Sequence, residues 1–382
     1  MVPARALASF YFAYFAFIGV FATYFSLYLD KRGFSPAEIG ILMSLLNVVR
    51  VVMPNVWAWL SDHTGAHLNI IRVTFSIAIF AFSALFFATG FWQLFVVIVV
   101  MCAFWSAAMP IFEATTMSYL EGDAARYGRI RLWGSVGFIV AVSAAGWWLD
   151  FVPIDWLLWL VLALMLVTLA CAFIVPERIT PPHEHDAVPI GDVLRRPGVG
   201  LFFLACFLMI ASQGASFVFY SIYMVEQGFS KATVGVLWSV GVVAEIIIFL
   251  FLPRIFGRFS LYHLWLLSFG LTVVRFLIVA WMPSVLALQV FAQALHMFSF
   301  GTYHATALAV LHANFKGRLK ARGQALYTSL SFGLGGAVGG MLSGWTWQAW
   351  GAGWTFTVSS ALALAGLALI LLRPDVLNRQ PG

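Results

Sequence analysis

The sequence is built from long apolar blocks that are almost free of charge and are separated by short polar stretches. Each block is long enough to cross the ~30 Å hydrocarbon layer of a bilayer as an α-helix. Of the 382 residues, 62% are hydrophobic and 9% are charged, whereas a soluble domain carries about a quarter charged residues. The pattern therefore predicts an all-α, polytopic membrane protein.

The blocks predict twelve transmembrane helices. Their ranges are 6–29, 37–60, 69–90, 92–120, 130–149, 154–175, 199–225, 232–252, 261–281, 284–312, 322–348 and 352–373. With both termini in the cytoplasm, Lys31, Arg32 and Lys231 fall outside, Arg50 and Arg275 fall within spans, and the other basic residues fall inside. This bias predicts that orientation.

The net charge of +6 follows from the inward bias, so nucleic acid is not expected as a partner. We expect a monomer in the inner (plasma) membrane whose partners are the lipid bilayer, protons and a small-molecule substrate. No cofactor besides the proton gradient is expected, and the chain has no Walker A motif that would indicate ATP drive. Cys102, Cys171 and Cys206 lie in apolar spans and are expected to be buried thiols.

The chain divides into two similar halves. The proline-rich, charged segment 176–198 separates six spans from six more and predicts a cytoplasmic linker between an N-terminal bundle, 1–175, and a C-terminal bundle, 199–382. Its HEHD run lacks the further ligands expected of a metal site. Segment 26–50 repeats in 221–245 at a constant offset, with identical Gly33/Gly228 and Ser44/Ser239 pairs. Parallel six-helix repeats of this kind are typical of alternating-access carriers.

Seven ionisable residues lie within spans or at their ends, where charge is costly and indicates function. They are Arg50, Glu113, Arg131, Glu245, Arg275, His296 and His304. Arg50 and Glu245 occupy equivalent positions of the repeat with opposite charge. Either each pins helices together through a local pair, or they take part in a charge relay or bind substrate.

Glu113 and Arg131 flank the predicted turn of a helical hairpin near 121–128, so we expect them to meet or to share a ligand. A carboxylate and a guanidinium suit sugar hydroxyls or a substrate carboxylate, although a structural salt bridge is the alternative. His296 and His304 are eight residues apart, which is about 80° around an α-helix. They are expected to look into one cavity for proton relay or substrate binding, with a structural role as the alternative.

Asp62 and Gly65 lie in the loop between the second and third spans, where Gly65 permits a tight turn and Asp62 can cap a helix. This D-x-x-G spacing resembles the loop signature G-x-x-x-D-[RK]-x-G-[RK] of the major facilitator superfamily. Ala58, His63 and Ala66 depart from that signature, which predicts an incomplete charge network at the inner gate. In the eleventh span, glycines four residues apart indicate close helix packing, with flexing during transport as the alternative.

The segments GFSPAEIGIL, YGRIRLWGSVGF, GVLWSVGVVAEIIIF and GQALYTSLSFGLGG resemble the phenylpropionate permease branch of this superfamily, which is related to lactose permease. The resemblance implies two six-helix bundles and secondary transport. It also implies that Glu113 and Arg131 stand where lactose permease binds galactoside.

The resemblance further places His296, in LHMF, at a histidine that binds sugar and couples protons, and Arg275 at the arginine of the preceding span. Ser299 replaces a glutamate essential to coupling in lactose permease. Glu245 lies about one turn from the matching glutamate. His304 has no equivalent in lactose permease, but the sequence around it resembles the phenylpropionate branch.

Together these observations predict a secondary transporter, not an enzyme. Glu113, Arg131, His296 and His304 are expected to bind substrate, and Glu245, Arg275 and His296 to couple protons. The substrate is expected to be an aromatic acid imported with protons. A sugar, galactoside or nucleoside symporter, an efflux carrier and a non-transporting membrane sensor remain alternatives.

Overall fold

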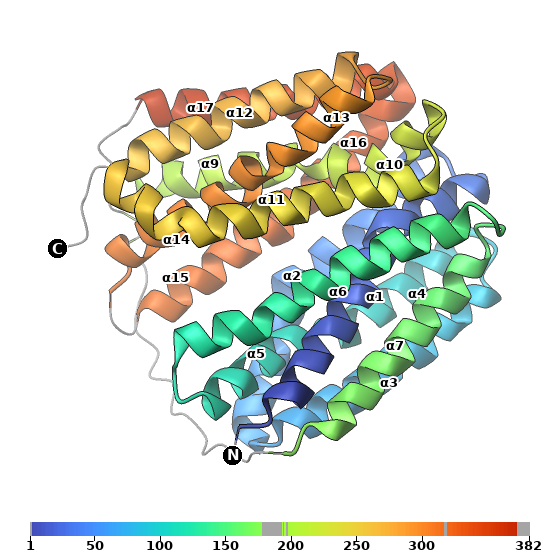
Figure 1. Cartoon of the computed structure of the whole chain (residues 1–382), viewed down its shortest axis with the longest axis vertical. Helices are drawn as coiled ribbons and strands as arrows, with labels where there is room; N and C mark the ends of the chain where they lie inside the picture. The colour runs from blue at the N-terminus through green and yellow to red at the C-terminus, as the bar shows by residue number, and fades with distance from the viewer. Residues whose placement is uncertain (1, 178–192, 194, 196–197, 317–318, 373–382) are drawn as a thin grey trace. The chain divides into compact units, whose positions relative to one another are not determined.

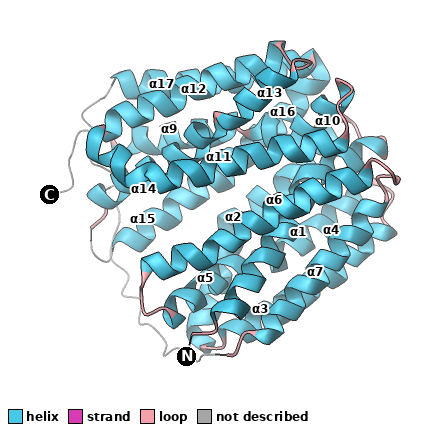
Figure 2. Ribbon diagram, in the orientation of Figure 1, coloured by secondary structure: helices cyan, strands magenta, loops and turns pink. Residues whose placement is uncertain are grey.

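The computed structural model describes residues 2–177, 193, 195, 198–316 and 319–372, and all regular structure in these ranges is helical (Figures 1 and 2). The HEHD run, 183–186, lies outside the described residues. Within the described residues, eleven helical stretches are long and apolar enough to cross a membrane, and four of them join helices that are named separately below. The all-α membrane fold predicted from the apolar blocks is confirmed.

The helices begin and end close to the predicted spans. In chain order they are α1 (Ala4–Lys31), α2 (Pro36–Thr64), α3 (His67–Ser83), the short η1 (Ala84–Phe86), α4 (Phe91–Trp105), α5 (Ala108–Tyr119), α6 (Ala124–Leu149), α7 (Trp156–Ile174), α9 (Val199–Ser212), α10 (Gly214–Glu226), α11 (Lys231–Arg258), α12 (Leu261–Trp281), α13 (Leu286–Ala294), η2 (Met297–Thr302), α14 (Tyr303–Asn314), α15 (Leu319–Tyr327), η3 (Thr328–Gly335), α16 (Gly336–Trp350) and α17 (Ala352–Leu372).

The chain forms two compact units. Unit 1 contains Met1–Phe34, Val48–His185 and Ser230–Ser239, and unit 2 contains Ser35–Asn47, Asp186–Phe229 and Val240–Gly382. Most of each unit comes from one predicted half, but the first turns of α2 belong to unit 2 and those of α11 to unit 1. The division into bundles 1–175 and 199–382 stays a prediction.

The internal repeat has the same local structure in both copies. Gly33 and Gly228 have φ of 82° and 87°, a left-handed conformation that favours glycine. Gly33 N donates to Asp30 O and Gly228 N to Val225 O, each at 2.9 Å. The two segments are thus equivalent in backbone geometry as well as in sequence.

Glycines allow close helix packing within each unit. In unit 1, α1 runs beside α6 (Figure 1), and a methyl group at Gly137 would collide with the Phe12 backbone. In unit 2, a methyl group at Gly339 would collide with the Ala211 backbone, and one at Gly344 would lie 2.6 Å from Pro36 O. The glycines of the eleventh span therefore pack backbone against backbone, as small residues in membrane helices do.

The tenth predicted span, 284–312, is not one continuous α-helix. It consists of α13, a π-helical segment η2 and α14, and the eleventh span contains a second π-helical segment, η3. The expectation of regular α-helical spacing between His296 and His304 is therefore wrong, because η2 lies between them. π-helical segments are rare and frequently mark functional sites.

Candidate functional site

Glu113 and Arg131 lie side by side in unit 1. Arg131 Nε on α6 is 3.8 Å from Glu113 Oε1 on α5. The connecting hairpin turns at Glu121 and Gly122, which both have positive φ, and the Asp123 side chain then caps the first turn of α6. The two charged residues are about equally far from this turn, so the hairpin brings them to the same level, as predicted.

Aromatic rings of α1 position the Arg131 guanidinium. Its central carbon lies 4.0 Å from the centre of the Phe15 ring and 5.6 Å from that of Tyr11. Gly134, nearly one turn further along α6, leaves the space for this stacking. A Cβ there would lie 2.7 Å from Phe15 Cδ2 and 2.8 Å from Arg131 Nη1.

The Glu113–Arg131 pair is accessible to a solute. Its side chains are 41% and 30% exposed. An accessible ion pair contributes only about 0–1 kcal/mol to stability, so a purely structural role gains the fold little. A guanidinium stacked on rings beside a carboxylate is suited to bind hydroxyl groups or a carboxylate.

A second polar cluster, in unit 2, is centred on Arg275 of α12. Arg275 Nη1 donates to Ser299 Oγ at 2.9 Å and to Gln213 Oε1 at 3.0 Å, and it lies 3.2 Å from His296 Nδ1. Arg275 Nη2 donates to Gln293 Oε1 at 3.5 Å. These contacts tie α12 to α13, to η2 and to the residue between α9 and α10.

The Arg275 cluster surrounds a buried cation with neutral groups. Arg275 is 3% exposed, and its Nε is buried without a hydrogen-bond partner. No carboxylate within the ranges that the structure describes forms an ion pair with it. A buried cation without an adjacent counter-charge is costly, so this arrangement requires an explanation beyond packing.

Glu245 of α11 contacts the other side of the His296 ring. Its Oε2 lies 4.0 Å from His296 Nε2, and the two side chains are 20% and 14% exposed. Gly301 in η2 makes this approach possible, because a Cβ there would lie 3.3 Å from Glu245 Cγ and 3.0 Å from Ile248 Cγ2. Arg275 and Glu245, predicted as a linked pair, are thus joined through the two nitrogens of one imidazole.

His304 belongs to a stack of rings that continues from His296. Phe300 stacks on His296 with ring centres 5.4 Å apart and on His304 with ring centres 6.1 Å apart. His304 Nδ1 lies 3.0 Å from the Tyr327 hydroxyl. The three rings come from positions spaced four residues apart, in the π-helical segment η2 and directly beside it.

Comparison with known proteins gives the family. The sequence model of the MFS_1 like family matches residues 4–358 of this chain. The chain belongs to the MFS_1 like family. It is 30% identical to the probable 3-phenylpropionic acid transporter of Escherichia coli (strain K12), over 97% of both chains. It is 25% identical to the maltose permease of Geobacillus stearothermophilus, over 95% of this chain and 92% of the permease.

Solved structures show the same fold for this MFS_1 like chain. A crystal structure of the nucleoside transporter NupG matches with a TM-score of 0.81 at 17% identity, covering 97% of this chain and 99% of NupG. A bacterial homologue of the lysosomal transporter Spinster matches with a TM-score of 0.75 at 15% identity, covering 98% and 96%. The family and these relatives are transporters, so the chain is a multi-pass membrane transporter and not an enzyme, with a small molecule as its substrate.

The remaining predicted residues of this transporter lie apart from the two clusters. Arg50 is partly buried on the unit 1 part of α2, close to Tyr14 and Cys102. Gly65 has φ of 64° and ends the turn after α2, as its predicted role requires. The side chain of Asp62 lies outside the described structure, so its capping role stays a prediction.

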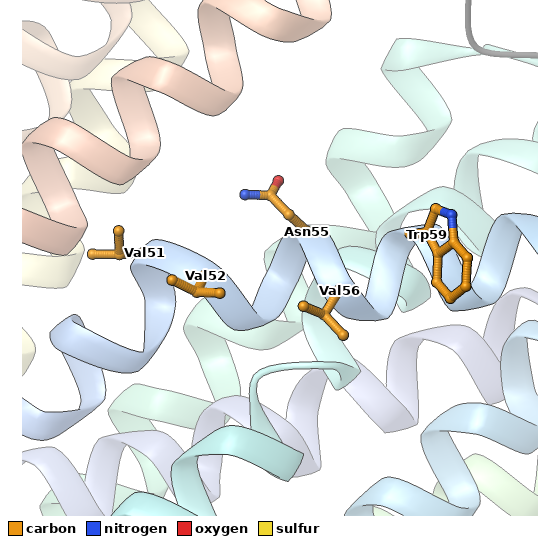
Figure 3. A pocket seen from close by; sticks show the side chains of 5 residues that line it. All are labelled: Val51, Val52, Asn55, Val56 and Trp59. Atoms are coloured by element: carbon orange, nitrogen blue, oxygen red, sulfur yellow. The ribbon is translucent and has the colours of Figure 1, made fainter.

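The unit 1 part of α2 also carries a hollow on its surface. Figure 3 shows the side chains that line it, all from successive turns of this one helix: Val51, Val52, Asn55, Val56 and Trp59. The lining offers apolar surface and one amide but no ionisable group. The hollow therefore contains no side chain that could recognise a charge.

The two glutamines of the Arg275 cluster were not predicted. Gln213 and Gln293 are 0% and 3% exposed, yet the sequence gives them only as amides within apolar segments. Tyr327, the partner of His304, was also missed. A list of every polar residue within the spans, rather than the ionisable ones alone, would have included both glutamines.

Proposed function

We propose that this transporter is a proton symporter that imports a small organic solute by alternating access. The observation that carries the proposal is the contact between Glu245 and His296 inside an apolar helical unit. A carboxylate in such surroundings can change protonation during a transport cycle, and its contact with a polar ring links that change to the shape of the site.

The roles proposed for the site residues follow the two clusters. Glu113 and Arg131 bind the substrate in unit 1, where the Phe15 ring beside the guanidinium suits the aromatic ring of such a solute. His296 binds substrate and takes part in coupling with Glu245 and Arg275, and His304 lines the cavity. The similarity to a probable 3-phenylpropionic acid transporter supports an aromatic acid as the first candidate substrate.

The same proposal includes the arrangement in the membrane. The transporter is a monomer of the inner membrane with both termini in the cytoplasm, as the distribution of basic residues indicates. The bundles 1–175 and 199–382 move during the cycle, and 176–198 links them. Its energy source is the proton gradient, without a further cofactor.

A sugar or nucleoside is the second candidate substrate. The rings of Phe15 and Tyr11 beside Glu113 and Arg131 also suit a sugar, and one relative is named a maltose permease. Efflux and a sensor without transport are the further alternatives. Accumulation of solute against its gradient distinguishes a carrier from a sensor.

The test is uptake into proteoliposomes with an imposed pH gradient, using labelled phenylpropionate, maltose, a galactoside and a nucleoside. We expect accumulation of phenylpropionate that stops when the gradient is collapsed. Glu245→Gln should lose gradient-driven accumulation, whereas Glu226→Gln, at an exposed position of the same unit, should retain it. Uptake that ignores the gradient would refute symport.

The substrate site in unit 1 has its own test. Glu113→Gln and Arg131→Ala should each reduce the rate of uptake about tenfold or more, the loss expected for one hydrogen bond to a charged group. Arg129→Ala changes an exposed arginine of the same helix and should have little effect. Unchanged uptake in both site variants would show that substrate binds elsewhere.

A further inference from the structure

The contact between Arg275 and His296 determines which ring nitrogen carries the proton. A guanidinium has only donors and stays charged, so it cannot accept a hydrogen bond from an imidazole N–H. His296 Nδ1, 3.2 Å from Arg275 Nη1, must therefore be the unprotonated acceptor. The proton of the neutral ring is then on Nε2, the nitrogen that faces Glu245.

The charges around this ring change when Glu245 takes up a proton. With Glu245 ionised, one anion and one cation lie on opposite sides of a neutral imidazole. A proton moving from water to a Glu245 oxygen converts the carboxylate to a neutral carboxyl group. The positive charge of Arg275, surrounded by neutral side chains, is then left without a compensating charge beside the ring.

We propose that His296 Nε2–H is a binding site for a carboxylate, occupied by Glu245 when Glu245 is ionised and by the carboxylate of a monoanionic organic substrate when Glu245 is protonated. This rests on the proposed function, because it names the chemical class of substrate that the same site takes. Proton and organic anion then bind together, since each restores the charge balance that the other disturbs.

The geometry supports an exchange at this end of the ring. Arg275 is buried, whereas His296 and Glu245 both retain exposed surface. A substrate therefore reaches Nε2 more readily than the guanidinium, and the charge of Arg275 acts through the imidazole. Hydrogen bonds to ionised groups are about twice as strong as neutral ones, so the polarised N–H favours a carboxylate over an amide.

The other groups that face the ring and the guanidinium are neutral, so the charge balance of the site depends on the protonation of Glu245. Tyr220 of α10 lies near Arg275, and its hydroxyl is neutral in the physiological range. Gln213, Gln293 and Ser299 carry no charge. Ser299 is the specificity-determining position, because a carboxylate in place of its hydroxyl would pair with Arg275 directly.

The first experiment measures binding without transport. Glu245→Gln imitates the protonated carboxyl group, and the protein in nanodiscs at about pH 8 is titrated with propionate, 3-phenylpropionate and neutral 3-phenylpropanamide. Heteronuclear NMR of labelled histidine monitors both ring nitrogens of His296. We expect Glu245→Gln to bind both carboxylates at least about tenfold more tightly than the wild type, with a shift at Nε2 and none from the amide.

The second experiment changes Ser299. Ser299→Asp in the Glu245→Gln background should abolish carboxylate binding, because the new side chain neutralises Arg275. Ser299→Asn introduces a side chain of the same shape as aspartate but without its charge, and it should retain carboxylate binding. Carboxylate affinity unchanged by Glu245→Gln, or a His296 ring protonated on Nδ1 in the wild type, would overturn the proposal.

These outcomes separate the inference from the proposed function. Tight carboxylate binding by Glu245→Gln without proton-driven uptake in the wild type would refute symport and leave the anion site standing. Proton-driven uptake that depends on Glu245, together with carboxylate binding that ignores Glu245 and Ser299, would refute the anion site and leave symport standing.

Discussion

Gly134→Ala places one methyl group between the Arg131 guanidinium and the Phe15 ring. The added Cβ would lie 2.7 Å from Phe15 Cδ2 and 2.8 Å from Arg131 Nη1, whereas ordinary contacts begin at 3.4 Å. The two neighbours must therefore retreat by about 0.6–0.7 Å. Arg131 Nη1 is the end of a long, flexible side chain, whereas the Phe15 contact is near the base of its ring. The stacked guanidinium is therefore expected to move while the α1 and α6 backbones stay in place.

The displacement should reduce transport more than stability. A misplacement of about 1 Å in a binding site can cost up to about 100-fold in rate, so we expect kcat/KM for uptake to fall about tenfold, or ~1.4 kcal/mol. Alanine is favoured over glycine in a helix by about 1 kcal/mol, which offsets part of the cost of the new contacts. Thermal stability should therefore change little.

The assay compares initial uptake rates in proteoliposomes with unfolding followed by a thiol-reactive dye, for which the buried Cys102, Cys171 and Cys206 are the reporters. Gly128→Ala is the matched control, because it lies on the same helix and a Cβ there meets nothing within 4 Å. Wild-type uptake by Gly134→Ala would refute the role given to the position of Arg131. Loss of uptake together with early unfolding would refute the view that only side chains move.

Three further changes test the packing around the sites. Gly344→Ala should destabilise unit 2 by about 1–3 kcal/mol, because the new Cβ would lie 2.6 Å from a backbone oxygen; a lower dye-monitored unfolding temperature checks this. Asp150→Ala removes the carboxylate that accepts from the first amides of α11 and should cost about 0.5–2 kcal/mol in the same assay. Tyr327→Phe removes the hydroxyl at His304 and should cost about 1 kcal/mol, with a shift of the His304 Nδ1 NMR signal as the direct reading.

The features that the sequence predicted well depend on local patterns or on short separations along the chain. Apolar blocks predict membrane helices because the bilayer demands internal hydrogen bonding over a fixed thickness. The Gly33/Gly228 repeat predicts two equal turns, because a left-handed residue at that point favours glycine. The Glu113–Arg131 pair was predictable because a tight hairpin leaves one way for two flanking helices to align.

The Arg275 cluster was only partly predictable, because its members meet through tertiary packing. Resemblance pointed to Arg275 and His296, but no local pattern places Gln213 beside an arginine 62 residues later. Hydropathy also treats 284–312 as one helix, since a π-helical segment contains the same apolar residues as an α-helical one. Gly301 of this segment lies against Glu245 and Ile248 of α11, and hydropathy contains no such tertiary contact.

Ser299 shows how one residue can change the role of the charged groups around it. If position 299 carried a carboxylate, Arg275 would be paired on its own side, and His296 and Glu245 would form a separate pair. With serine, the hydroxyl accepts from Arg275 Nη1 at 2.9 Å and donates to His296 O at 3.3 Å. It carries no charge, so the counter-charge must act through the imidazole. In our proposal the same arginine and histidine then have a different consequence, because protonation of Glu245 is linked to the charge of the ligand at His296 Nε2. In the exchange that we propose, a neutral sugar would leave the Arg275 charge uncompensated at that step, whereas a monocarboxylate would compensate it.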